Sequence, residues 1–482
     1  MMMKIAQSAE EWARMTYGSV MLGDHRRTER SVQLASALGR QPMASLPAQL
    51  GSAAASKAAY RLFESSQVSY ENLLRPHLEQ TQASMQQQGR VLLIQDMTEV
   101  DYQHHPHTSG LGPIGNGTHQ GYLLQTVLAV EPTSQQVLGI AAQEAFLRQP
   151  APPGETSAQR EKRAHRESEV WQRQVQRIGA APAGCEYIHV GDRGSDIFAF
   201  LRECLTQGCG FEVRVKHDRR VDVRVEDAET PPPSGARRYA GQRPAGQGPP
   251  QHLFEVVRSW PQQGRRTLEL DGNQKRKGRE AHLCISWGKL RLWAPDGEAG
   301  KGERPLVVTV VRTWEPNPPA GVEALEWLLL TSVETESEAQ AWERVEWYRL
   351  RWIVEDYHQC LKTGCQIEHR QLQSYDGLRT LLGFLAPLAV WLLQLRAVAR
   401  QEPERAASEV LPPDVVKVVA HLAKVPPACL TTRACWHRIA QAGGYLGRTS
   451  DGEPGWKTLW KGWLYIQTLL EGVHLASELS LE

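Results

Sequence analysis

The chain has almost no net charge, few cysteines and no apolar segment at its start. Its 482 residues carry 55 Lys+Arg against 54 Asp+Glu, so no global basic field indicates a nucleic-acid partner. The eight cysteines form no CxxC pair and no disulfide-scaffold spacing, which indicates a reducing compartment. The N-terminus, MMMKIAQSAEEW, lacks the apolar core of a signal peptide. We therefore expect a cytoplasmic protein.

Long apolar runs are also scarce. Only LLGFLAPLAVWLLQL (Leu381–Leu395) approaches membrane character, and it is too short to span a bilayer and contains Pro387 and Gln394. This pattern predicts a buried core helix and no membrane partner.

Basic residues are concentrated locally. Residues 211–300 hold 17 Lys+Arg against 12 Asp+Glu, with a dense run KRKGR (Lys275–Arg279), and residues 1–90 hold 10 against 7. Such patches suit phosphate contacts, and they are also typical of a solvated charged surface.

The order of elements indicates an α/β core between helical ends. The first ninety residues are helical in pattern, with Asp24 as an N-cap in DHRRTERSVQLASAL and a second helix in SAAASKAAYRLF. Three strand-like runs follow, RVLLIQD, GYLLQTVLAVE and VLGIAAQEAF. The GxGxxG between Gly110 and Gly115 precedes a strand rather than a helix, so it predicts a hairpin loop and not a dinucleotide site.

The next segments complete that core. A charged helical segment (156–178) precedes the strand in CEYIHVGDRG, the helix DIFAFLRECL and the strand FEVRVKH. This order predicts an RNase H-like, retroviral integrase-like α/β fold. Residues 218–324 read as a mainly β insertion, with a flexible loop around Pro231–Pro250. EWLLLTS then returns to the core, and the remainder is helical.

One helix, YRLRWIVEDYHQCLKTG, mixes an apolar face with a polar stripe. At about 100° per residue, Tyr348, Arg351, Glu355 and Lys362 fall on one side, opposite the apolar residues. Gly364 is expected to stop the helix, at the C′ position. By itself the stripe is also typical of a solvated face with an i,i+4 Arg–Glu pair.

Two acids end apolar strands, and a third lies in this stripe. Asp96 and Asp192 each close a strand-like run, and Glu355 comes from a helix that can lie beside the sheet. Converging carboxylates repel one another unless they share a cation, and Mg²⁺ is the natural partner for oxygen ligands. Two such ions about 3.5–4 Å apart suit phosphodiester cleavage. Arg351, Lys362 and Tyr348 can then meet phosphates.

Alternatives remain at each acid. Asp is a common turn former at strand ends, and Glu99, Asp101, Asp196 and Asp356 lie close in sequence to the three chosen acids. HHPH (His104–His107) has no fourth ligand at standard zinc spacing, so a polar loop is the better interpretation.

The spacing Y-(2)-R-(3)-E-(6)-K resembles the signature of bacterial insertion-sequence DDE transposases. Further blocks resemble that family in the same order: LGDHRRTER, ALGRQP, GDRGSDIFAFL, EWLLLTS and LLQLR. The resemblance covers most of the chain, weakly in 218–300 and 401–430. Two departures stand out, Gln359 where a cation would strengthen the stripe, and MTEVDY after Asp96.

The resemblance implies a catalytic triad of Asp96, Asp192 and Glu355 that holds two Mg²⁺, with Mn²⁺ as a substitute. It implies cut-and-paste transposition by a homodimer on double-stranded DNA, through nicking, a DNA hairpin and joining of the 3′-OH to target DNA. The location implied is the bacterial cytoplasm, at the nucleoid during action. The implied DNA contacts are Tyr348, Arg351, Lys362, Trp327, Arg214, Lys216, Arg26, Arg27, Arg30 and Arg40.

Three domains and two rival functions complete the expectation. We expect a helical DNA-binding domain over 1–75, a catalytic core over 76–375 and a helical dimerisation domain over 376–482. A non-catalytic protein that binds transposon ends or inhibits transposition is the first alternative, and a general nuclease on the same core is the second. Trp327 equally suits a core strand, and the N-terminal arginines equally suit a solvated helix face.

Overall fold

The computed structural model of the chain describes residues 8–149, 166–223, 251–270, 278–295, 303–448 and 451–479, together with 152, 154–156 and 159. The expected loop around Pro231–Pro250 and residues 275–277 of the basic run lie outside the described residues. Part of the charged segment 156–178 does so too, and its described helix is α7 (Glu169–Ile178).

Five strands form an RNase H-like core sheet in the order β4-β3-β1-β5-β6. These are β1 (Arg90–Asp101), β3 (His119–Val130), β4 (Val137–Phe146), β5 (Glu186–Gly191) and β6 (Gly210–Arg214). β1, β3 and β4 pair antiparallel, whereas β5 and β6 run parallel to β1. The short strand β2 (Gly112–Ile114) pairs antiparallel with the start of β3, which confirms the hairpin predicted for the GxGxxG segment.

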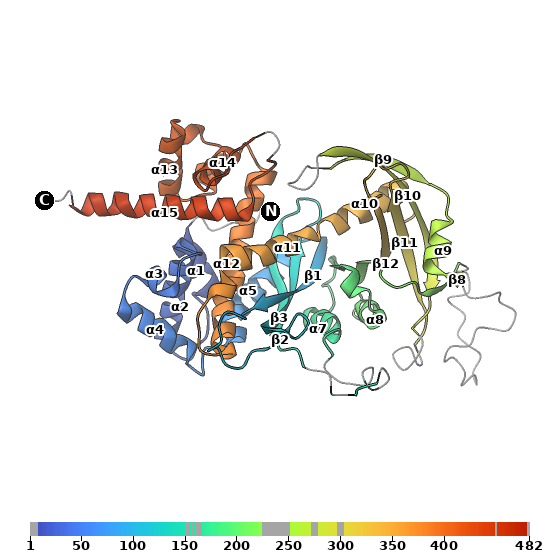
Figure 1. Cartoon of the computed structure of the whole chain (residues 1–482), viewed down its shortest axis with the longest axis horizontal. Coiled ribbons are helices and arrows are strands. Elements are labelled where there is room, and N and C mark those ends of the chain that lie inside the picture. The colour runs from blue at the N-terminus through green and yellow to red at the C-terminus, as the bar shows by residue number, and fades with distance from the viewer. Residues whose placement is uncertain are drawn as a thin grey trace.

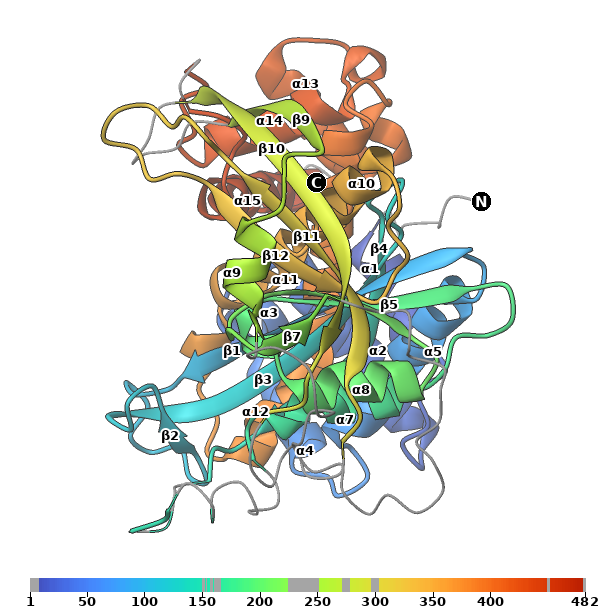
Figure 2. The ribbon, with the colours of Figure 1, turned by 90° about the vertical axis from the view of Figure 1, so that its right-hand side faces the viewer.

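The β insertion extends this sheet instead of forming a separate one. Its described elements are β7 (Arg220–Asp222), β8 (Gln251–His252), α9 (Leu253–Arg258), β9 (Gly264–Leu270), β10 (Arg279–Leu292) and β11 (Leu306–Trp314). β12 (Glu326–Thr331), from EWLLLTS, joins the two parts because it pairs with β6 on one side and β11 on the other. Figure 2 shows the long strands of the insertion rising from the core.

Helices cover both faces of the core. α7 and α8 (Phe198–Thr206) bury Trp171 and Phe200 against one face. The other face is covered by α5 (Tyr70–Met85), α10 (Glu338–Arg349), α11 (Trp352–Gln359) and α12 (Tyr375–Gln401). In Figure 1, α10 and α11 run from the insertion across β1 towards α12.

The N-terminal helices rest on α12. They are α1 (Ala9–Tyr17), α2 (His25–Arg40), α3 (Leu46–Leu50) and α4 (Ala53–Phe63). The predicted N-cap is confirmed, because the Asp24 carboxylate accepts the N–H of Arg26 at 2.8 Å. Trp12 stacks on Trp391 of α12 with ring centroids 5.4 Å apart, and the Tyr17 hydroxyl donates to Gly383 O at 2.8 Å.

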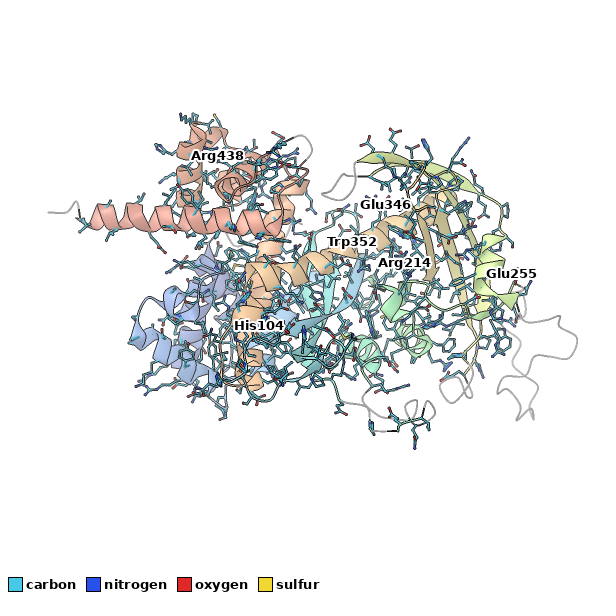
Figure 3. All side chains as sticks on the ribbon, in the orientation of Figure 1. His104, Arg214, Glu255, Glu346, Trp352 and Arg438 are labelled. Atoms are coloured by element: carbon cyan, nitrogen blue, oxygen red, sulfur yellow. The ribbon has the colours of Figure 1, made fainter. Side chains whose placement is uncertain are left out.

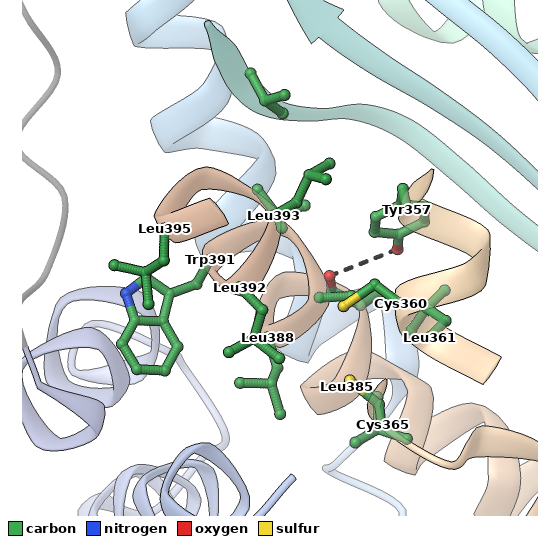
Figure 4. Close-up of a cluster of buried hydrophobic side chains, with 14 of the residues drawn as sticks. Tyr357, Cys360, Leu361, Cys365, Leu385, Leu388, Trp391, Leu392, Leu393 and Leu395 are labelled. Atoms are coloured by element: carbon green, nitrogen blue, oxygen red, sulfur yellow. Dashed lines mark hydrogen bonds between the residues drawn. The ribbon is translucent and has the colours of Figure 1, made fainter. Parts of the chain in front are cut away.

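The apolar run Leu381–Leu395 belongs to α12, which is longer than the run itself. α12 is long and apolar enough to cross a membrane, yet 89% of its most apolar window is buried inside the protein. Tyr357 of α11 points at its backbone in Figure 4, with its hydroxyl 3.5 Å from Ala386 O. The run therefore lies in a buried core helix, as predicted.

The C-terminal helices are α13 (Pro413–Ala423), α14 (Thr432–Ala442) and α15 (Trp456–Leu479). α14 and α15 cross with backbones in direct contact at Gly443 and Gly462, where a side chain would overlap a carbonyl oxygen of the facing helix. The stacked pair Trp436–Trp463 flanks the crossing. Beyond it, α15 extends away from the rest of the molecule (Figure 1).

The crossing makes Gly462 intolerant of substitution. We expect Gly462→Ala to destabilise the C-terminal helices by about 1–3 kcal/mol, because its methyl group meets Ile439 O and forces α14 and α15 apart. Gly472→Ala, in the same helix but facing open space, is the matched control and should gain up to about 1 kcal/mol of helix propensity. Urea unfolding measures both, and equal effects would contradict the close crossing.

Candidate active site

Asp96 lies in the middle of β1, not at the strand end that the sequence predicted. β3 pairs with β1 as far as Asp101, whereas β5 stops pairing at Gln95, one residue before Asp96. Asp96 is therefore the first residue of β1 beyond the part that pairs with the parallel strand β5. Its Oδ1 accepts the N–H of Met97 at 2.9 Å.

Asp192 follows the last residue of β5 and caps a single 3₁₀ turn (Arg193–Ser195). Its Oδ1 accepts the N–H of Gly194 at 2.7 Å. Because β5 is parallel to β1, this turn lies beside Asp96. Burial, then the charge of Asp192, and further the charge of Glu355, raise the pKa of Asp96 to about 7.

Glu355 comes from α11, which crosses β1 and β3. Its Oε1 lies 2.6 Å from a guanidinium nitrogen of Arg351, one turn earlier. Among the described residues, no group of three or more His, Cys, Asp or Glu side chains is gathered closely enough to hold a metal ion as they stand. The donor set itself fits a hard divalent cation, since, in addition to burial, the charges of Asp192 and Glu355 both act on Asp96 and raise its pKa, although Arg351 offsets part of that repulsion.

Tyr348 and Arg351 are buried beside this cluster, with 4% and 8% of their surfaces exposed. The Tyr348 ring packs edge-on against Trp327 of β12 with centroids 5.2 Å apart. The Arg351 guanidinium lies over the rings of Tyr348 and Trp352 at 5.8 and 5.1 Å. The aromatic rings thus hold the guanidinium between the acids and β12.

The predicted single helix is interrupted twice. α10 ends at Arg349, and Arg351 and Val354 donate to carbonyls three residues back, at 3.1 and 3.2 Å, in a tightened turn before α11 continues. This change lets α10 follow β5, β6 and the insertion while α11 follows β1 and β3. A π-helical turn (Cys360–Gly364) then carries Lys362.

The helical segment does stop at Gly364, as predicted, because the π-helical turn ends there, but Gly364 itself is not left-handed. The left-handed residue is Gln366, with φ of 53°. Gly364 lies inside the π-turn, where a methyl group would come within 2.6 Å of the Trp460 indole nitrogen of α15. Close packing, not backbone conformation, explains this glycine.

Lys362 is engaged by a backbone carbonyl and a carboxylate of the protein itself. Its ammonium donates to Glu99 O at 2.6 Å and lies 3.0 Å from a Glu368 carboxylate oxygen. A phosphate that binds here has to compete with Glu368 for this cation.

Three family models match the chain. "Transposase DNA-binding" matches residues 9–68, "Transposase DDE domain" matches 162–392, and "Transposase Tn5 dimerisation domain" matches 388–481. The order of the three matches agrees with the transposase signature formed by Tyr348, Arg351, Glu355 and Lys362 (the YREK residues). The chain is a Tn5-like DDE transposase. The matched DDE range contains Asp192, Glu355 and the YREK residues, whereas Asp96 precedes it.

In this transposase the competing acids already have partners. Asp101 pairs with His119 at 2.8 Å, Glu99 with Arg148 at 3.0 Å and Asp356 with Arg396 at 3.3 Å. Asp196 is 1% exposed, pairs with Arg219 and accepts the N–H groups of Lys216 and His217 at 2.7 and 2.9 Å. These contacts favour structural roles for the four.

The predicted DNA contacts divide into two kinds. Arg214 is half-buried near Tyr348, with a guanidinium nitrogen 3.5 Å from Glu326 O of β12. Lys216 is exposed. Arg26 and Arg30 are exposed on α2. Arg27 instead donates to Leu22 O at 2.9 Å, and Arg40 pairs with Glu10.

Sequence reasoning missed two residues of the site. Trp352 is 59% exposed, at the start of α11 beside Arg351. His358 is buried, with its Nδ1 4.0 Å from Asp96 Oδ2. Burial, then the nearby Lys362, lower the pKa of His358 to about 3, so its imidazole is neutral. Both lie within the quoted motif, but only tertiary packing distinguishes them from ordinary helix residues.

Asp196 and Asp192 should respond differently to truncation. We expect Asp196→Ala to cost about 3–5 kcal/mol of unfolding free energy, because it leaves Arg219 buried without its partner. Asp192→Ala removes one turn cap and should cost about 1 kcal/mol. Chemical denaturation measures the free energy of unfolding of both variants. Equal losses would contradict the structural role assigned to the Asp196–Arg219 pair.

The raised pKa of Asp96 should appear in metal-free stability. The pKa of Asp96 is about 3.8 in the unfolded chain and about 7 in the folded protein. The folded state therefore favours the protonated carboxyl, and the folding free energy that Asp96 supplies at low pH is lost as pH rises between these values. We therefore expect Asp96→Asn to stabilise the chelator-treated protein at about pH 8 by on the order of 2–4 kcal/mol, at about 1.4 kcal/mol per pKa unit. The gain should shrink towards pH 5.

Asp101→Asn is the matched control on the same strand. The N–H of Gln103 and the pairing with His119 outweigh burial and lower the pKa of Asp101, so its contribution is present at neutral pH and lost on acidification. Its replacement should destabilise the protein at about pH 8. If both substitutions changed the free energy of unfolding in the same direction at about pH 8, the environments assigned to Asp96 and Asp101 would be contradicted.

Proposed function

We propose that this transposase moves DNA by a cut-and-paste reaction. It binds the terminal repeats, cleaves each end by Mg²⁺-dependent hydrolysis through a DNA hairpin, and joins the freed 3′-OH to target DNA. It acts as a homodimer in the bacterial cytoplasm, on nucleoid DNA. The observation that carries the proposal is the placement of Asp96, Asp192 and Glu355, from three separate elements, against Tyr348 and Arg351.

Asp96, Asp192 and Glu355 would hold two Mg²⁺, or Mn²⁺. When bound, the ions activate a water or 3′-OH and stabilise the leaving oxygen. In the first step water attacks phosphorus and the P–O3′ bond breaks, leaving a 3′-OH. That hydroxyl would next attack the phosphorus on the opposite strand, forming the hairpin bond as a second P–O3′ bond breaks and releases the flanking DNA. Water would reopen the hairpin and regenerate the 3′-OH, which would attack a target phosphorus and displace a target 3′-OH.

Arg351 is proposed to change partners as DNA enters. Its guanidinium now pairs with Glu355 at 2.6 Å. A phosphate beside Tyr348 offers a competing anion, so Arg351 can bind it and leave Glu355 available to a cation. Lys362 can exchange Glu368 for a second phosphate in the same way. Through these exchanges, Glu355 would become available to bind a metal ion only when DNA phosphates are present.

Trp327 is proposed to stack on an extruded base near the hairpin. It lines a cavity of about 650 Å³ with Trp352, between the insertion and α10–α11. An indole face suits a flipped base of any sequence. Arg214, Lys216 and the α2 arginines would contact the backbone of the same end.

The domain division that we propose is 1–75, 76–375 and 376–482. Support comes from the DNA-binding and dimerisation models at either end. The first division falls inside α5, which packs on β4 and α12, so this helix links the N-terminal domain to the core.

Cleavage of a duplex carrying the element's own end tests the proposal. With Mg²⁺ or Mn²⁺, the wild-type protein should nick the duplex and form a hairpin. The nicking rate should fall by on the order of 1000-fold or more in each of Asp96→Ala, Asp192→Ala and Glu355→Ala. Glu255→Ala is the control, since Glu255 lies on the far side of the insertion (Figure 3) and should leave the rate unchanged.

Two outcomes would replace the proposal. Tight end binding without cleavage at any metal concentration would favour the non-catalytic end-binding protein. Equal cleavage of unrelated DNA would favour a general nuclease.

A further inference from the structure

We infer that Thr126 and His358 are positioning residues of the active site, which orient the Asp96 carboxylate and hold the catalytic helix α11 in register over β1. The inference rests on the proposed function of Asp96 and Glu355. It concerns a buried polar row that runs across the sheet beneath α11.

The row consists of three directly opposed residues on adjacent strands. Asp96 of β1 faces Thr126 of β3, and Thr126 faces Gln143 of β4. Thr126 and Gln143 are 0% and 5% exposed. Polar side chains at such depth are costly unless every group is bonded, so their bonding pattern is informative.

Two consecutive residues of α11 reach down to this row. Tyr357 accepts a hydrogen bond from the Gln143 amide nitrogen at 2.9 Å, and His358 Nε2 lies 3.2 Å from Thr126 Oγ1. His358 follows Glu355 by three residues, so both project from the same side of the helix. The contacts that anchor His358 therefore also set where Glu355 stands relative to Asp96.

The hydrogen-bond directions along the row are determined by its outer members. Tyr70 OH lies 3.0 Å from Gln143 Oε1 and donates to it, so the amide group of Gln143 donates both to Tyr357 and to Thr126 Oγ1 (2.9 Å). Thr126, as an acceptor from Gln143, has its own hydroxyl hydrogen available for His358 Nε2.

This direction places the remaining ring N–H of His358 on Nδ1, which faces Asp96 Oδ2 at 4.0 Å. The other carboxylate oxygen of Asp96 accepts the Met97 N–H. Asp96 is thus held by a hydrogen bond from its own strand, and the Nδ1–H of His358 approaches its other oxygen from the helix that carries Glu355, at a distance longer than a direct hydrogen bond. Outer contacts of this kind commonly change metal affinity or activity by about 10- to 100-fold when removed.

Thr126→Val removes the hydroxyl at nearly constant volume, and Thr126→Ser restores it. We expect Thr126→Val to reduce the single-turnover nicking rate of end DNA by about 10- to 100-fold and Thr126→Ser to recover most of it. End binding in a gel-shift assay should be unchanged. Thr81→Val is the matched control, since Thr81 is 1% exposed and its hydroxyl donates to His77 O at 2.8 Å on α5, away from the site.

His358 allows a second, independent variant pair. The amide nitrogen of asparagine can occupy the position of Nδ1, and that of glutamine the position of Nε2. We expect His358→Asn to keep more nicking activity than His358→Gln, because only the former retains a donor facing Asp96. If Thr126→Val does not fold, this pair decides the question by itself.

A direct metal measurement separates positioning from general stability. Free Mn²⁺ counted by electron paramagnetic resonance, in the complex of the protein with end DNA, should show affinity about 10- to 100-fold weaker for Thr126→Val and unchanged for Thr81→Val. Wild-type rates and Mn²⁺ affinity in Thr126→Val, or equal rates in the two His358 variants, would overturn the inference. Failure of wild type to nick would overturn the proposed function instead.

Discussion

The repulsion among three carboxylates is the constraint on which the site depends. Asp96 lies in β1, Asp192 directly follows β5 and Glu355 lies in α11, and each brings a carboxyl group into a partly buried space. No short segment can hold such charges together, because each would move towards water. The long central sheet, with helices on both faces, supplies the rigidity that keeps them close.

Aromatic and cationic side chains surround that cluster and balance it. Arg351 pairs with Glu355 while its guanidinium lies against Tyr348 and Trp352. Because the same cation can serve a carboxylate or a phosphate, the pairing seen here and the binding proposed for DNA are alternatives. Trp327 lies on β12, the strand that joins the insertion to the core sheet, and its ring packs against Tyr348, so the insertion borders the site.

Much of the site could be predicted because its signals are local. The YREK spacing, the two aspartates that follow apolar runs, and the β insertion all depend on residues near one another in sequence. Asp96 was placed correctly in β1 but not at its end, since strand length depends on β3, a partner far along the chain. The prediction of one continuous helix over residues 348–364 was wrong for a similar reason. Its turns change where it passes from one part of the sheet to the next.

By itself the sequence determined the α/β order, the helical ends, the acidic residues and the stripe, because periodicity and residue chemistry are properties of short segments. Only the tertiary structure decided which acids lie near one another and which pair with residues of other elements. Asp196 and Asp356 acquire partners from other elements, Arg219 and Arg396, and His358 becomes a neighbour of Asp96 through packing of α11 on β1. Ion pairs and buried hydrogen bonds join residues distant in sequence, and their partners are settled only when the chain has folded.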